Sequence, residues 1–144
     1  PLTTNCYRYV LTGTHPQVPP AVTLTTTVLL DTTPPVNGAF TVNGAAATLA
    51  GSSSSVPAGA NFSVAAVTGY AETQSTLASS TFTRTTGVST AGVCGGFDPV
   101  STVTLPSSTQ PQNGLADGCY RYVLTGTNSF GGAASVTSTV RVGP

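Results

Sequence analysis

Charge is scarce in this sequence. Only 6% of the 144 residues are charged, the four basic residues balance the four acidic ones, and there is no lysine. Proteins that bind nucleic acid or anionic membranes need clusters of basic residues to contact phosphates, and none is present. We therefore expect no nucleic-acid partner and no electrostatic contact with a membrane. A surface with so little charge favours self-association.

Long apolar runs are also missing. No segment reaches the roughly 18 consecutive apolar residues of a transmembrane helix, so no direct membrane insertion is expected. The opening residues, PLTTN, contain neither the basic nor the apolar region of a signal peptide. A mature secreted protein lacks one as well, so the compartment stays open at this point.

The side chains that carry out catalysis or bind metals are few and scattered. The only histidine, His15, lies in a Thr-His-Pro turn without a nucleophile or an orienting partner close in sequence. Asp98 and Asp117 are candidates for an acid–base pair, but Asp117 precedes a glycine and is typical of a turn. No CxxC spacing or second histidine completes a zinc site, and the acids are too dispersed for calcium. We expect no enzymatic activity, no metal and no cofactor.

Short alternating runs of Val, Thr, Tyr and Phe between turn residues predict an all-β protein. The Asn-Gly pair at Asn43 and Gly44 predicts a type I′ turn between two strands. The serine run at 52–55 and the GVCGGF segment at 92–97 are expected to be loops. The expected strands cover residues 39–42, 45–49, 61–68, 76–85, 99–105, 119–127 and 135–142.

One stretch of sequence is repeated. The segment CYRYVLTGT occurs at residues 6–14 and again at 119–127, and the similarity continues where LTTTVLLD at 24–31 matches VTSTVRVG at 136–143. The prolines of the following DTTPPV cannot donate to a strand ladder and mark a boundary. We expect the chain to hold the terminal hairpin of an incomplete repeat, a linker and one complete repeat, at residues 1–31, 32–36 and 37–143.

The order of these segments, the DTTPPV linker and the strand LADGCYRYVLTGT resemble the immunoglobulin-like tandem repeats of bacterial secreted and cell-surface proteins. In that family a DGxYxYxVxATD-like strand precedes a final strand and a VDTTAP-like linker, and Asp117 begins the matching motif here. The resemblance implies an immunoglobulin-like antiparallel β-sandwich of about seven strands. The chain departs from antibody domains because it has no tryptophan and because Cys119 precedes the tyrosines. Tyr120 is a candidate for a tyrosine corner.

The three cysteines are interpreted through the repeat. Cys94 and Cys119 lie in the same complete repeat, which favours a disulfide between them, with two buried thiols as the alternative. Cys6 is the counterpart of Cys119, so we expect its partner upstream or in another copy, at the counterpart of Cys94. The odd number of cysteines then requires no reactive thiol.

The first hairpin is expected to be an assembly interface. Two isolated strands are marginally stable in water, and the complete repeat already contains an equivalent hairpin. We expect the first hairpin to complete a second sandwich whose other strands belong to a neighbouring copy or an adjacent repeat. The expected contact residues are Tyr7, Tyr9, Leu11, Leu24, Val28 and Leu30.

Two functions follow as expectations. The first is an extracellular structural protein, in which immunoglobulin-like repeats join head to tail into a cell-surface stalk or filament. The second is a ligand- or carbohydrate-binding module of a secreted adhesin or enzyme, for which an exposed aromatic strip or a convergent polar cleft would be needed. The serines at 52–55 and the threonines at 25–27 are possible sites of O-linked glycans.

Overall fold

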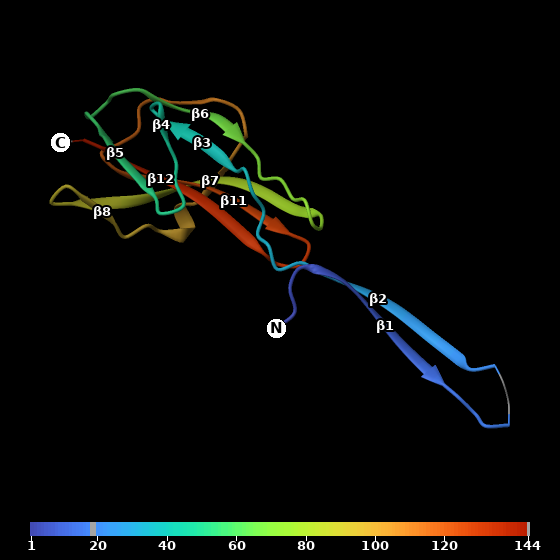
Figure 1. Ribbon diagram of the computed structural model, residues 1–144. Helices are drawn as coiled ribbons and strands as arrows, with labels where there is room; N and C mark the ends of the chain where they lie inside the picture. Colours follow the sequence, from blue (N-terminus) through green and yellow to red (C-terminus); the bar gives the residue numbers. More distant parts are fainter. Residues whose placement is uncertain (18–19, 144) are drawn as a thin grey trace. The chain divides into compact units, whose positions relative to one another are not determined.

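The computed structural model describes residues 1–17 and 20–143, and the fold is all-β as predicted (Figure 1). The chain divides into two compact units, residues 1–33 and the residues from Pro34 onward, and each is described by itself. In the described part of the chain the only helical element is one 3₁₀ turn, Pro99–Ser101. None of the described residues forms a helix long and apolar enough to cross a membrane.

The first unit is a β-hairpin. Strands β1 (Asn5–Gly13) and β2 (Val22–Leu30) pair antiparallel, with Tyr7 opposite Val28. The hydroxyl of Tyr7 donates a hydrogen bond of 2.8 Å to the carbonyl oxygen of Thr3, which ties the start of the chain to the strand.

The second unit contains a smaller and a larger sheet. The smaller sheet has four strands in the order β10-β6-β3-β4. Their bounds are Gln110–Gln112 for β10, Phe62–Thr68 for β6, Ala39–Val42 for β3 and Ala45–Ala46 for β4. All neighbours in this sheet are antiparallel.

The larger sheet has six strands. Five follow the order β5-β12-β11-β7-β8, and β9 also pairs with β7. Strand β12 runs parallel to β5 and antiparallel to β11. The bounds are Ser52–Val56 for β5, Ala133–Val142 for β12, Gly118–Asn128 for β11, Leu77–Thr90 for β7, Val93–Gly95 for β8 and Val103–Leu105 for β9.

The core lies where the two sheets of this second unit face each other. Alternate residues of each strand point inward because successive side chains in a strand occupy opposite faces. Phe40 of the smaller sheet meets Phe82 of the larger one, with ring centroids 4.9 Å apart. The ring of Tyr122 is 6.4 Å from those of both Phe62 and Phe82. Two sheets that share one core are consistent with a β-sandwich.

Several sequence-based predictions agree with this fold. Asn43 and Gly44 have φ values of 49° and 81°, as a type I′ turn requires. Strands β6, β7, β11 and β12 lie where alternation predicts them, and Phe82 is buried as expected.

Other expectations were wrong. The serine run is strand β5 because it pairs with β12, a tertiary contact that outweighs the low strand preference of serine. The GVCGGF segment contains strand β8. The expected strand at 99–105 begins as a 3₁₀ turn, because the carboxylate of Asp98 accepts a hydrogen bond from the amide of Val100 at 2.9 Å. Short segments such as these raise the number of strands above the expected count of about seven.

Candidate functional site

The hairpin β1–β2 has the same strand register as the hairpin β11–β12. Tyr7 lies opposite Val28 in the first, and their sequence counterparts Tyr120 and Val140 lie opposite each other in the second. The hydroxyl of Tyr120 donates a hydrogen bond to the carbonyl oxygen of Ala116 at 2.9 Å. The hydroxyl of Tyr7 makes the equivalent bond to Thr3, the counterpart of Ala116. This is the hydrogen bond of a tyrosine corner. The repeated sequence therefore produces the same local structure twice.

The two hairpins differ in what covers them. In β11 the side chains of Tyr122 and Leu124 are 0% and 1% exposed, whereas their counterparts Tyr9 and Leu11 in β1 are 53% and 69% exposed. Leu24 and Val28 of β2 are likewise exposed, and Tyr7 and Leu30 are half-buried. We call these predicted contact residues the assembly surface: Tyr7, Tyr9, Leu11, Leu24, Val28 and Leu30.

The edges of the hairpins also differ. In the larger sheet β11 pairs on its other side with β7, and β12 pairs with β5. Within the described residues neither β1 nor β2 has a second neighbouring strand. A strand with a free edge presents unpaired backbone donors and acceptors, which is a ready site for another strand. The first hairpin thus offers one apolar face and two free edges.

The equivalent cysteines of the two hairpins also differ in their bonding. Cys94 in β8 and Cys119 in β11 form a disulfide, across a sequence separation of 25 residues, as the sequence favoured. A loop of this size contributes about 3 kcal/mol to stability in the chain-entropy account. Cys6, at the equivalent position of β1, is an exposed free thiol.

A polar cluster lies behind the buried tyrosine of the second hairpin. The hydroxyl of Tyr122 donates to Oε1 of Gln112 at 3.0 Å, and Nη1 of Arg84 donates to the same oxygen at 2.8 Å. Burial raises the pKa of Tyr122, and the nearby charge of Arg84 offsets only part of that effect. The equivalent Tyr9 is exposed, so the first hairpin has the tyrosine but not the buried polar cluster around it.

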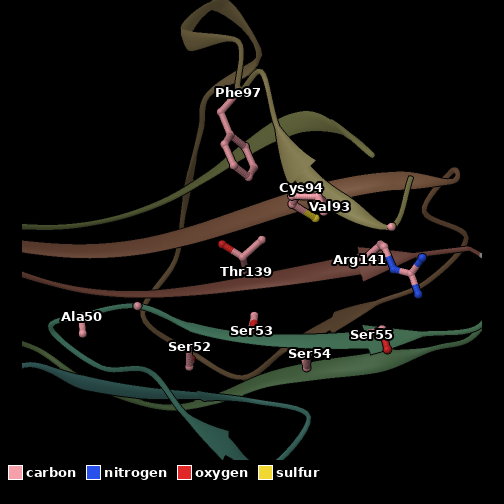
Figure 2. A pocket seen from close by; sticks show the side chains of 12 residues that line it. Ala50, Ser52, Ser53, Ser54, Ser55, Val93, Cys94, Phe97, Thr139 and Arg141 are labelled. Carbon is pink, nitrogen blue, oxygen red and sulfur yellow. The ribbon is translucent and has the colours of Figure 1, made fainter. Parts of the chain in front are cut away.

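A second candidate site is an open groove of about 670 Å³ on the larger sheet. Figure 2 shows Thr139 and Arg141 of β12 beside Ser53 and Ser55 of β5, with the ring of Phe97 on the other side of the groove. These side chains offer hydroxyl and guanidinium donors. The residues that line the groove include no carboxylate or histidine for acid–base chemistry. The groove was missed in the sequence because two of its walls, β5 and β8, were expected to be loops.

The scattered polar candidates are not brought together. His15 accepts a hydrogen bond from the amide of Gln17 at 3.2 Å within its own turn. Asp98 holds the 3₁₀ turn, and Asp117 directly precedes β11. Across residues 1–17 and 20–143 no three His, Cys, Asp or Glu side chains are grouped so that they could hold a metal ion.

Comparisons of the chain with protein-family models, with curated proteins and with solved structures found no match.

Proposed function

We propose that this protein is an extracellular structural protein, an immunoglobulin-like repeat unit of a bacterial surface stalk or filament. Units join head to tail, and the N-terminal hairpin of each one completes a neighbouring sandwich. One observation carries the proposal. The same sequence forms the covered centre of a sheet at β11–β12 and a bare hairpin at β1–β2. Bare apolar faces with free edges are associated with assembly.

The arrangement of strands supports the immunoglobulin-like assignment. In the larger sheet the last two strands are neighbours, with β7 beside β11, which matches the G-F-C order of an immunoglobulin sheet. The pairing of β3 with β6 and of β6 with β10 matches the A-B-E order of the opposite sheet. The disulfide departs from antibody domains, because it joins β11 to β8 and not to a strand of the opposite sheet.

The disulfide supports an extracellular location. Disulfides persist in oxidising environments and are rare in the reducing cytosol. The bond between Cys94 and Cys119 favours a non-reducing environment for the second unit. With few charged side chains on the surface, such a protein has little electrostatic repulsion to oppose contact with copies of itself.

The test is the particle mass of the full chain, measured by light scattering at rising protein concentration. We expect particles larger than the monomer, because the bare faces associate. The double substitution Leu11→Thr and Leu24→Thr, which keeps the strand preference but removes apolar area from the assembly surface, should restore the monomer. The control Val10→Thr changes the opposite face of the same hairpin and should associate like the unmodified chain.

A monomeric mass for all three proteins would contradict the assembly role. Equal association of all three would place the contact elsewhere on the molecule, which also contradicts it. Only loss of association in the Leu11→Thr and Leu24→Thr protein agrees with the proposal.

The groove on the larger sheet favours a second function, the ligand- or carbohydrate-binding module. Its hydroxyls and the guanidinium of Arg141 are suitable donors to a polar ligand. The aromatic contribution is small, because Tyr120 and Tyr122 are buried and the ring of Phe97 is already stacked on Arg121 at 4.3 Å. Titration with neutral oligosaccharides while the groove residues are followed by NMR would detect such binding.

A further inference from the structure

We infer that the partner of the β1–β2 hairpin is a polypeptide block similar to residues 34–113 of this chain. The block is an immunoglobulin-like repeat without its own last two strands, and it carries a cysteine at the position of Cys94 that bonds to Cys6. This inference rests on the proposed function and specifies the neighbour that the hairpin completes. It follows from residues that β1 shares with β11 and whose disulfide, ring or core partners are present only around β11.

Two residues on the outward face of β1 have specific partners only at their counterparts in β11. In β11 the outward residues include Cys119, which is bonded to Cys94, and Arg121, whose guanidinium lies 4.3 Å from the centre of the Phe97 ring. Strand β1 has Cys6 and Arg8 at these positions, and both are exposed. A generic sheet neighbour would require neither residue. A block that repeats the segment from β8 to Phe97 would contact both.

A glycine on the same strand also fits this partner. Gly126 is buried in β11, where an added Cβ would overlap the ring of Tyr70. Gly13 is its counterpart in β1, and there the nearest atom to an added Cβ is the carbonyl oxygen of Val22 at 4.0 Å. The first hairpin therefore keeps a glycine where its own surroundings leave room for a side chain. A tyrosine of the partner, equivalent to Tyr70, would require that glycine.

The inward face of β1 also fits a partner of this kind. Tyr122 donates its hydroxyl hydrogen bond to Gln112, which Arg84 also contacts. Its counterpart Tyr9 is an exposed tyrosine among contact residues that, apart from Tyr7, are aliphatic. A partner with the equivalents of Gln112 and Arg84 would bury this ring and supply an acceptor for its hydroxyl.

A second copy of this chain does not offer the required block in a free state. In the complete unit the edges of β7 and β5 are occupied by β11 and β12. The thiol of Cys94 is already in a disulfide. Docking on such a copy would require β11–β12 to leave and the disulfide to open. Contact between copies of this chain would thus involve their bare hairpin faces, whereas the sandwich that the hairpin completes belongs to a neighbouring block whose place for the last two strands is empty.

The partner differs from residues 34–113 where it meets β2. Apart from Asn5, strand β1 is identical to the matching part of β11. Strand β2, however, has Leu29 at the position of Arg141, which lines the groove of the second unit. The partner's strand beside β2 is thus expected to present a more apolar outer surface than β5, whose Ser53 and Ser55 lie near Arg141.

The covalent step needs an oxidant. The two thiols, Cys6 and the partner's cysteine, are joined by exchange with a small-molecule disulfide such as oxidised glutathione. The new sulfur–sulfur bond forms as the small-molecule disulfide is reduced to two thiols, which take up the two protons released. Two electrons pass from the protein thiols to the small molecule, so the step balances.

The experiment adds the block to the full chain. Residues 34–113 of this sequence are placed directly before Pro1, so that the added block and the hairpin together repeat the order of the complete unit. The protein is refolded with a mixture of reduced and oxidised glutathione. Free thiols are counted by alkylation, and the disulfides are mapped by mass spectrometry. We expect the count to fall from one free thiol in the unmodified chain to none, with Cys6 bonded to the cysteine of the added block.

Two variants of the extended protein test the contacts themselves. Gly13→Ala should lower the melting temperature of the domain that contains the added block, because the new methyl group meets the block's tyrosine. In the unmodified chain the same substitution should leave the melting temperature unchanged. A block with its cysteine replaced by alanine should leave Cys6 free and still bury the hairpin, which amide hydrogen exchange would record.

Several outcomes would overturn the inference. They are a Cys6 that is still alkylated in the extended protein, an added block that does not fold cooperatively, and a Gly13→Ala substitution that has no effect there. The complete unit has the same sequence and serves as the internal control for folding. These readouts do not depend on self-association. The unmodified chain can associate through its assembly surface while the extended protein fails, in which case the proposed function stands and only the inferred partner is wrong.

Discussion

Tyr9 and Tyr122 occupy the same position in two copies of one sequence, and their surroundings differ completely. Tyr122 is fully buried with a hydrogen-bonded hydroxyl, whereas Tyr9 is 53% exposed. Both sit in strands of the same register, so local sequence does not determine which one is buried. The neighbouring strands do. Burial of a side chain in a sheet depends on what packs against its face more than on its intrinsic strand preference.

The buried tyrosine makes stability depend on alkaline pH. Burial raises the pKa of Tyr122 in the folded protein above the ordinary value of about 10. Above that pH the unfolded chain releases the phenolic proton and the folded protein retains it, so the unfolded state is favoured. We expect stability to be insensitive to this group below pH 10 and to fall above it, by about 1.4 kcal/mol per pH unit.

Urea unfolding between pH 8 and pH 11 measures this dependence. Tyr122→Phe should flatten the alkaline decline, and Tyr9→Phe should leave the profile as it is in the unmodified chain. Burial also raises the pKa of Tyr70, so a smaller decline remains after Tyr122 is replaced. An identical profile for the Tyr122→Phe protein would show that this tyrosine is not the group responsible.

Among the elements, the first hairpin has the weakest internal support. A two-stranded hairpin is marginally stable in water, because it buries little apolar surface. Its internal contacts include the β1–β2 ladder, the hydrogen bond from Tyr7 to Thr3 and the hydrogen bonds between Thr4 and Thr32. By contrast, β11 and β12 have strands on both sides and a core beneath them. Under the proposed function, the first hairpin would gain the same support from a sheet of the neighbouring unit.

The paired glycines give a prediction at this scale. In the unmodified chain, Gly126→Ala should destabilise the second unit by about 1–3 kcal/mol, because the added methyl group overlaps the Tyr70 ring in a packed core. Gly13→Ala, the same change at the equivalent position of β1, should leave the free energy of unfolding unchanged. Urea unfolding followed by circular dichroism measures both. Equal losses of stability from the two substitutions would mean that both glycines are required for the backbone conformation and not for side-chain packing.

The sequence predicted elements where a local pattern exists. Alternation located β6, β7, β11 and β12, and the Asn43-Gly44 pair located a turn. Strands β5, β8 and β10 carry no such pattern, since serine, glycine and proline give weak strand signals and pairing partners decide their structure. The assembly surface stays a prediction, drawn from the repeat within the same chain. The groove was not predictable, because its walls come from β5, β8 and β12.

At the scale of the whole molecule, the chain combines a complete unit with an additional terminal hairpin. The second unit has a core, two sheets and a disulfide of its own. The first unit has the strands and the side chains of a sheet centre but not the sheet around it. Such a chain can pair with a strand of a neighbour through backbone hydrogen bonds and can bury its apolar hairpin face in that contact. This is the physical basis of the proposed stalk or filament.

The most direct measurement is amide hydrogen exchange of β1 and β11 in the same sample, at concentrations where the chain is monomeric and where it is assembled. The two strands share their sequence, so intrinsic exchange rates nearly cancel. We predict fast exchange in β1 and slow exchange in β11 for the monomer, with β1 becoming protected on assembly. Protection of β1 already in the monomer, or its continued fast exchange in the assembled particle, would contradict the claim that this hairpin is the connecting element.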